Sequence, residues 1–120
     1  MSPVQRSVSG PVLSFDLAQE MNAVRRDLNA ESSRVARTLV KDGPLTMTLV
    51  GVSAGGAVHA HKADGPVSLQ CLDGDIEVDA DARVWTLDPG ALLVLEPGVS
   101  HSVRSSSGGF FLLTVIAARR

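Results

Sequence analysis

The chain has 120 residues, of which 44% are hydrophobic, and a formal net charge of −2 at pH 7. This length suits one compact domain with one core. The small net charge, without any cluster of Lys or Arg, argues against nucleic acid or an anionic membrane surface as a partner. The sequence therefore predicts a single domain that binds neither.

Cysteine content and hydropathy give an expectation for the compartment. The one cysteine, Cys71, cannot form a disulfide within the chain, and the N-terminal residues carry no basic-then-apolar export signal. The longest apolar run, Phe110 to Ala118, is about half as long as a membrane-spanning helix. We therefore expect a protein of the reducing cytoplasm that is not inserted in a membrane.

The N-terminal quarter of the chain predicts an arm and a helix. Residues 1–13 contain two prolines and a glycine, which favour an extended arm. Residues 14–30 predict an amphipathic helix, with Ser14 as its N-cap. The apolar positions of this helix are spaced by four, three and four residues, and they are Leu17, Met21, Val24 and Leu28.

Residues 31–118 have the pattern of a β-domain on which the helix packs. Short runs rich in Val, Leu, Ile and Thr alternate with turn sequences, including the hairpin signal Asp73-Gly74. The expected strands are residues 35–40, 45–52, 66–72, 75–78, 83–87, 91–95, 101–105 and 110–117. About eight short strands predict an all-β fold that closes into a barrel or jelly roll.

An acidic series could be mistaken for a cation site. Acidic residues occupy every second position from Asp73 to Asp81, and Ile76 and Val78 alternate with them. This alternation is typical of a strand with one solvated face, whereas a calcium loop wraps its ligands around a glycine bend. We interpret the series as a solvated face.

The three histidines of the chain are the candidate chemical groups. His59 and His61 are separated by one residue, so an extended backbone would place both imidazoles on one face, about 7 Å apart at the backbone. Two rings placed in this way can share a metal ion. The third, His101, follows a Pro-Gly turn.

Together these residues resemble the two motifs of the cupin superfamily. The stretch Gly55–His61 is similar to the opening of the first motif, and Cys71–Gly74 is similar to its close. Gly90 and the stretch Glu96–His101 resemble the second motif. The chain therefore resembles a small, single-domain conserved-barrel (cupin_2-like) protein, and the resemblance implies a cupin jelly roll with one N-terminal helix.

The chain also departs from the family pattern. Val67 stands where the family has a glutamate ligand, and Ser105 stands where the second motif ends in asparagine. Asp64 is the nearest carboxylate that could replace the glutamate. Gln70 is a second polar candidate, but strand alternation places it on the opposite face from Val67.

The resemblance implies that His59, His61 and His101 hold a divalent transition metal such as iron, manganese, zinc or nickel, with open positions for water or substrate. The expected pocket is mostly aliphatic, and its residues are Val67, Leu69, Cys71, Leu93, Leu95 and Val103. We interpret Cys71 as a small core residue rather than a nucleophile.

Two functions remain open from the sequence. The first is a metal-dependent enzyme of oxygenase, isomerase or lyase type that acts on a small, largely apolar substrate. The alternative is a module that binds or senses a small molecule without catalysis, with or without metal. The resemblance also implies a homodimer formed through an outer sheet, in which the N-terminal arm could exchange between subunits.

Overall fold

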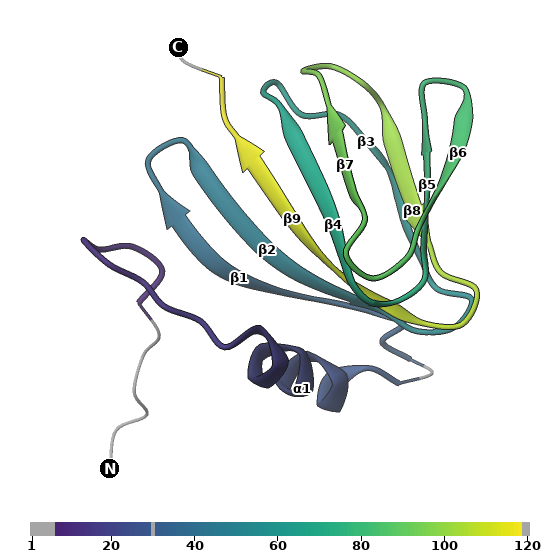
Figure 1. The fold of residues 1–120 in the computed structure, drawn as a ribbon, viewed down its shortest axis with the longest axis horizontal. Coiled ribbons are helices and arrows are strands. Elements are labelled where there is room, and N and C mark those ends of the chain that lie inside the picture. Colours follow the sequence, from purple (N-terminus) through teal and green to yellow (C-terminus); the bar gives the residue numbers. More distant parts are fainter. Residues whose placement is uncertain (1–6, 30, 119–120) are drawn as a thin grey trace.

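The computed structural model describes residues 7–29 and 31–118, and it shows one helix and two antiparallel sheets that face each other (Figure 1). The helix is α1 (Leu17–Asp27). The strands are β1 (Arg34–Asp42), β2 (Leu45–Val52), β3 (Ala57–His61), β4 (Val67–Gly74), β5 (Ile76–Ala80), β6 (Arg83–Leu87), β7 (Leu92–Leu95), β8 (His101–Arg104) and β9 (Gly109–Ile116).

The strand order is that of a jelly roll. The five-stranded sheet has the order β1-β2-β9-β4-β7, and the four-stranded sheet has the order β3-β8-β5-β6. Each sheet combines strands from distant parts of the chain, since β9 lies between β2 and β4, and β8 lies between β3 and β5. The all-β class with one N-terminal helix and the jelly-roll barrel, both predicted from the sequence, are confirmed.

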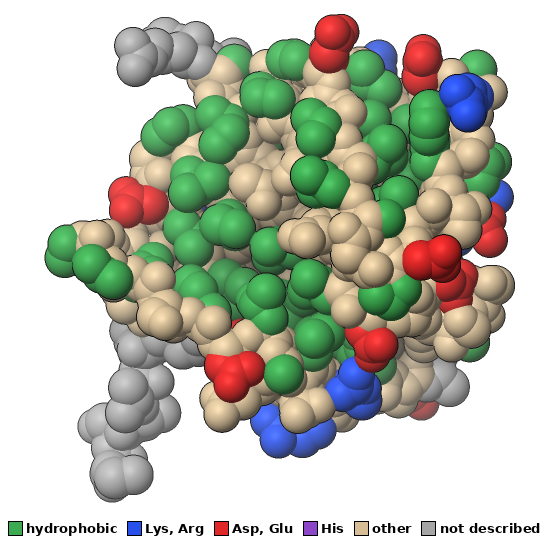
Figure 2. Space-filling model, viewed as in Figure 1, with side chains coloured by type: hydrophobic (Ala, Val, Ile, Leu, Met, Phe, Trp, Pro, Cys, Tyr) green, Lys and Arg blue, Asp and Glu red, His purple; other side chains and the backbone are tan. Residues whose placement is uncertain are grey.

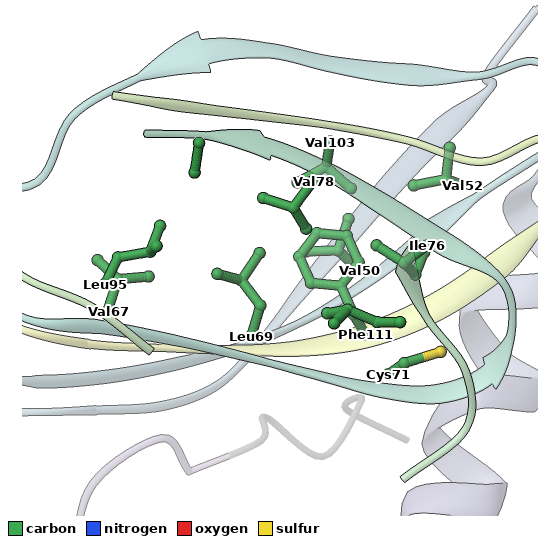
Figure 3. Close-up of a cluster of buried hydrophobic side chains, with 12 residues drawn as sticks. Val50, Val52, Val67, Leu69, Cys71, Ile76, Val78, Leu95, Val103 and Phe111 are labelled. Carbon is green, nitrogen blue, oxygen red and sulfur yellow. The ribbon is translucent and has the colours of Figure 1, made fainter. Parts of the chain in front are cut away.

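Strand alternation sorts the apolar residues into two clusters on opposite faces of the five-stranded sheet. In β2, Val50 and Val52 face the barrel interior, whereas Leu49 faces the helix. The barrel cluster fills the space between the sheets, where side chains from the two sides point toward one another (Figure 3). Its buried members are Val50, Val52, Val67, Leu69, Cys71, Ile76, Val78, Ala80, Leu87, Leu95, Val103 and Phe111.

The helix cluster covers the part of the outer face of the five-stranded sheet that is formed by β1, β2 and the start of β9. Its buried members are Val24, Leu39, Val40, Leu49 and Phe110. All four apolar positions predicted for one helix face belong to it or pack against it. The helix begins at a different cap from the predicted Ser14, because the Asp16 carboxylate accepts hydrogen bonds from the backbone N–H groups of Ala18 and Gln19.

The segment before the helix packs more closely than the predicted arm. Leu13 and Phe15 lie against the helix cluster, and the Val8 carbonyl accepts a hydrogen bond from the backbone N–H of Lys41 in β1. Residues 1–6 of the predicted arm lie outside the described residues. Within the described part of the chain, no helix is long and apolar enough to cross a membrane.

One strand was absent from the sequence expectation. All eight expected strands are present with ends that differ by at most a few residues, but β3, which carries two of the histidines, is a ninth strand. Its sequence, Ala-Val-His-Ala-His, offers one β-branched residue and no continuous apolar alternation, so the strand pattern is weak.

Candidate functional site

A cavity of about 240 Å³ lies between the two sheets. Strands β1, β2, β4 and β9 form one wall and strands β3 and β8 form the other. The lining residues are Arg34, Ala36, Thr48, Val50, Val58, His61, Leu69, His101, Val103, Phe111 and Leu113. Most of these side chains are apolar, so the two imidazoles, one guanidinium and one hydroxyl supply the polar groups of the cavity.

A β-bulge in β3 decides which histidines reach this cavity. Val58 pairs with Val103 of β8, but His61 pairs with His101, so two residues of β3 stand opposite the single residue Ser102. The extra residue reverses the alternation within β3. Val58 and His61 therefore both line the cavity, whereas His59 lines a separate hollow together with Ala57.

This arrangement differs from the expectation that His59 and His61 share one face. That expectation assumed a regular extended backbone, in which residues two apart point the same way. The bulge inserts one residue and separates the two rings. The structure brings together His61 and His101, and it places His59 elsewhere.

His61 and His101 lie side by side across the β3–β8 pair. Their ring centroids are 4.2 Å apart, with an angle of 63° between the ring planes. Each Nδ1 lies 3.2 Å from the backbone carbonyl oxygen two residues earlier, which belongs to His59 in one case and to Val99 in the other. Because a carbonyl oxygen only accepts, these contacts assign the proton of each neutral ring to Nδ1 and leave a lone pair on Nε2.

His101 is the one buried side chain of the described residues with an unsatisfied polar atom. It is 1% exposed, and its Nε2 has no hydrogen-bond partner. Burial lowers the pKa of His101 below its ordinary value, the hydrogen bond to Val99 opposes this shift, and the neighbouring His61 adds to it. The ring is therefore neutral at pH 7 and Nε2 is an acceptor. A buried acceptor without a partner costs about 1–3 kcal/mol, which a ligand that donates to it would recover.

The other predicted site residues occupy three different environments. Leu69 and Val103 line the cavity, Val67, Cys71 and Leu95 are buried in the barrel cluster, and Leu93 packs against that cluster. Burial raises the pKa of the Cys71 thiol, and the side chain is fully buried, which agrees with a core role.

Neither polar substitute for the missing glutamate lines the cavity. The Asp64 carboxylate accepts a hydrogen bond of 3.1 Å from the backbone N–H of Ala118, beyond the end of β9. Gln70 lies between Leu69 and Cys71 in β4, so alternation places it on the outer face of the sheet.

The histidines of the cavity are fewer than the ligands of a typical metal site. The described residues contain no group of three or more His, Cys, Asp or Glu side chains that could hold a metal ion. The two cavity imidazoles could each offer an Nε2 lone pair to a metal ion. They would supply two ligands, whereas catalytic zinc sites typically have three protein ligands. The three-histidine site stays a prediction.

Arg34, Thr48 and Phe111 are cavity residues that the sequence reasoning missed. Arg34 has the same strand phase as Ala36 of β1, and Thr48 has the same phase as Val50 of β2. The alternation was visible in the sequence, but the face toward which it points became known only from the pairing of β1 with β2 and of β2 with β9.

No protein-family model matches the sequence, and no curated protein matches it. Solved structures do match. A conserved protein of unknown function from Streptococcus pyogenes is 23% identical with a TM-score of 0.75, and the match covers 100% of this chain and 98% of that one. A cupin superfamily protein from Desulfitobacterium hafniense is 15% identical with a TM-score of 0.70, and the match covers 72% and 80%.

A salicylate 1,2-dioxygenase variant from Pseudoaminobacter salicylatoxidans is 14% identical with a TM-score of 0.78, and the match covers 93% of this chain but 37% of that one. At these identities the similarity shows the fold. The chain has the cupin fold, and its structural neighbours include cupin superfamily proteins.

Proposed function

We propose that this cupin-fold protein binds a small, largely apolar molecule in the cavity between its two sheets. The observation that carries the proposal is the buried Nε2 of His101, an unsatisfied acceptor in the wall of a mostly apolar cavity. Buried polar atoms in folded proteins almost always have a partner. A ligand with an apolar body and one hydrogen-bond donor would supply it.

The cavity volume limits the size of this molecule. Ligand pockets for drug-sized molecules span about 300–1,000 Å³, whereas an apolar cavity of about 150 Å³ binds benzene. At about 240 Å³, the barrel cavity has room for one ring or a short branched chain with one or two polar substituents. Large substrates such as sugar nucleotides exceed it.

Titration with phenol and toluene, followed by NMR chemical shifts of backbone amides, tests this function. Phenol should bind more tightly than toluene, because its hydroxyl can donate to His101. The cavity-filling substitution Val103→Phe should abolish binding of both, whereas Val94→Phe, on the exposed outer face, should not change it. Absence of shifts with both compounds at millimolar concentration in the folded protein would overturn the proposal.

A metal ion is a second candidate, favoured by one further observation. Both cavity imidazoles have Nδ1 held by a backbone carbonyl, the arrangement that usually orients a metal-ligating histidine. His61 and His101 would hold a divalent ion such as iron, manganese, zinc or nickel. When bound, it would act as a Lewis acid or activate oxygen. His59 would join them only if the bulge in β3 were lost.

Elemental analysis separates the two metal proposals. His61→Ala should release a metal held by the His61–His101 pair, and His59→Ala should not. Release by both substitutions would instead support the predicted three-histidine site. Less than about a tenth of a metal ion per chain after incubation with these four metals would remove the metal-dependent oxygenase, isomerase or lyase from consideration.

We also propose that the protein forms a homodimer through the outer face of the five-stranded sheet. Exposed apolar side chains gather on the outer face of the five-stranded sheet, which faces the viewer in Figure 2. The exposed fractions are 59% for Leu92, 63% for Val94 and 39% for Ile116. Light scattering after size exclusion should give a dimer for the native protein and a monomer for Val94→Glu, and a native monomer at micromolar concentration would end the proposal.

A further inference from the structure

The cavity lining contains one arginine, Arg34, that forms no ion pair with any other described residue. Arg34, in edge strand β1, pairs with Val52 of β2, and Ala36 pairs with Val50. Directly opposed residues of an antiparallel pair point to the same face, so Arg34 faces the barrel interior together with the two valines of the barrel cluster. It lines the cavity at the edge of the sheet and remains exposed to solvent.

The other arginines on the strands that line the cavity form ion pairs. Arg37, three residues along β1 and on the opposite face, bonds to Glu20 of the helix, and Arg104 in β8 bonds to Glu77 and Asp79. Arg34 has no ion pair within the described part of the chain. Glu31 borders the neighbouring hollow with Arg34, but the two side chains form no salt bridge there.

We infer that the cavity selects a small hydrophobic carboxylate, with Arg34 holding its anionic group. This inference rests on the proposed function and names the ligand class. A guanidinium offers a planar pair of donors that matches a carboxylate, and such charge-assisted bonds are roughly twice as strong as neutral ones.

The polar groups of the cavity indicate how this ligand would be oriented. The carboxylate belongs at Arg34 rather than beside the imidazoles, because the contact of the His101 Nδ1 with the Val99 carbonyl oxygen leaves a lone pair on Nε2, which would repel an anion. The apolar body lies against residues such as Leu69 and Phe111. A hydroxyl on the body would satisfy His101, so hydroxylated acids should bind more tightly than the parent acids.

Benzoate and benzamide are matched probes for this inference, because they have nearly the same shape and differ in charge. We expect the native protein to bind benzoate about tenfold or more tightly than benzamide, measured by NMR titration at constant salt. Arg34→Met should reduce this preference to less than about twofold, because it should weaken binding of the anion far more than binding of the neutral amide. Arg37→Met, the same change on the opposite face of β1, should retain the preference.

The outcomes separate the inference from the proposed function. Binding of benzamide with no preference for benzoate, or a preference that Arg34→Met leaves intact, would overturn the carboxylate inference and keep the apolar binding site. Absence of binding by benzoate, benzamide, phenol and toluene to the folded native protein would overturn both. Unchanged circular dichroism of each variant establishes that the fold is retained.

Discussion

Two polar side chains of the barrel, Asp75 and His101, differ in how fully they are hydrogen-bonded. The Asp75 carboxylate, at the β4–β5 turn, accepts hydrogen bonds from the backbone N–H groups and the hydroxyls of Ser106 and Ser107. Ser105 donates to the Asp75 carbonyl oxygen at 2.6 Å. The buried Nε2 of His101, at the other end of β8, has no partner.

Asp75 is a structural polar group, whereas His101 is a candidate binding group. A carboxylate that is fully hydrogen-bonded joins the β8–β9 loop to the β4–β5 turn, so its contribution is to stability. An unsatisfied buried acceptor lowers the stability of the free protein and contributes favourably only when a ligand donates a hydrogen bond to it. Substitutions at the two places should therefore change different measured quantities.

The largest expected effect is at Gly74, next to Asp75. Its φ is +72°, and a Cβ atom there would lie 2.0 Å from the Gly108 carbonyl oxygen. Gly74→Ala should lower the free energy of unfolding by more than about 3 kcal/mol, measured by urea denaturation, because backbone strain and a clash add together. Gly90→Ala is the matched control, since Gly90 has φ +93° but open space, and it should cost only about 1 kcal/mol.

Removal of the Asp75 carboxylate should have the next largest effect. Asp75→Ala leaves the Ser106 and Ser107 donors without their acceptor, so unfolding should become easier by about 2 kcal/mol. Asp79→Ala, which removes an ion pair with the exposed Arg104, should have a clearly smaller effect, because water and salt screen an exposed pair. Equal losses in the two variants would contradict the structural role assigned to the serine contacts.

The same carboxylate should make stability depend on pH under acidic conditions. The hydrogen bond from the Ser107 hydroxyl, followed by those from Ser106, lowers the pKa of Asp75 from 3.8 to about 2, although partial burial opposes the shift. Because the folded-state pKa is depressed, this contribution is present above pH 4 and is lost as pH falls toward 2. It amounts to about 1 kcal/mol after allowance for solvent screening.

Urea denaturation of the native protein and of Asp75→Asn, repeated between pH 5 and pH 2, measures this contribution. The difference in unfolding free energy between the two proteins should shrink by about 1 kcal/mol across that range. A difference that stays constant with pH would contradict the lowered pKa.

The smallest expected change in stability is at His101. His101→Leu removes the unsatisfied acceptor and retains apolar volume, so the free energy of unfolding should change by less than about 1 kcal/mol. The preference for phenol over toluene should disappear in the same variant. A loss of unfolding free energy above about 2 kcal/mol would show that His101, like Asp75, mainly stabilises the fold. That result would contradict the proposed binding role.

Much of the fold follows from local patterns. The sequence predicted strands β2 and β4, and in β4 the alternation also predicted the interior residues Val67, Leu69 and Cys71. Asp73-Gly74 marked a turn that requires a positive φ. The spacing of the four apolar helix positions predicted the face that packs on the sheet. The N-cap was misplaced by two residues, since Ser14 and Asp16 are both good caps and only the hydrogen bonds distinguish them.

The candidate site depended more on tertiary structure. The sequence identified both neighbouring imidazoles, His61 and His101, as candidates. The side chain of His59 lies outside the cavity because of the bulge, which forms through pairing with β8. Likewise, the sequence placed Arg34 just before a strand and gave no reason to prefer it over Arg37. The pairing of β1 with β2 decided that Arg34 faces the cavity and Arg37 the helix.

The sequence by itself determined the fold class, the turns and some of the residues between the sheets, because periodicity and turn chemistry act over a few neighbouring residues. Only the tertiary structure decided which polar groups share the cavity. Strand register joins residues such as His61 and His101 that are 40 positions apart, and a shift of one residue reverses the face of every side chain that follows.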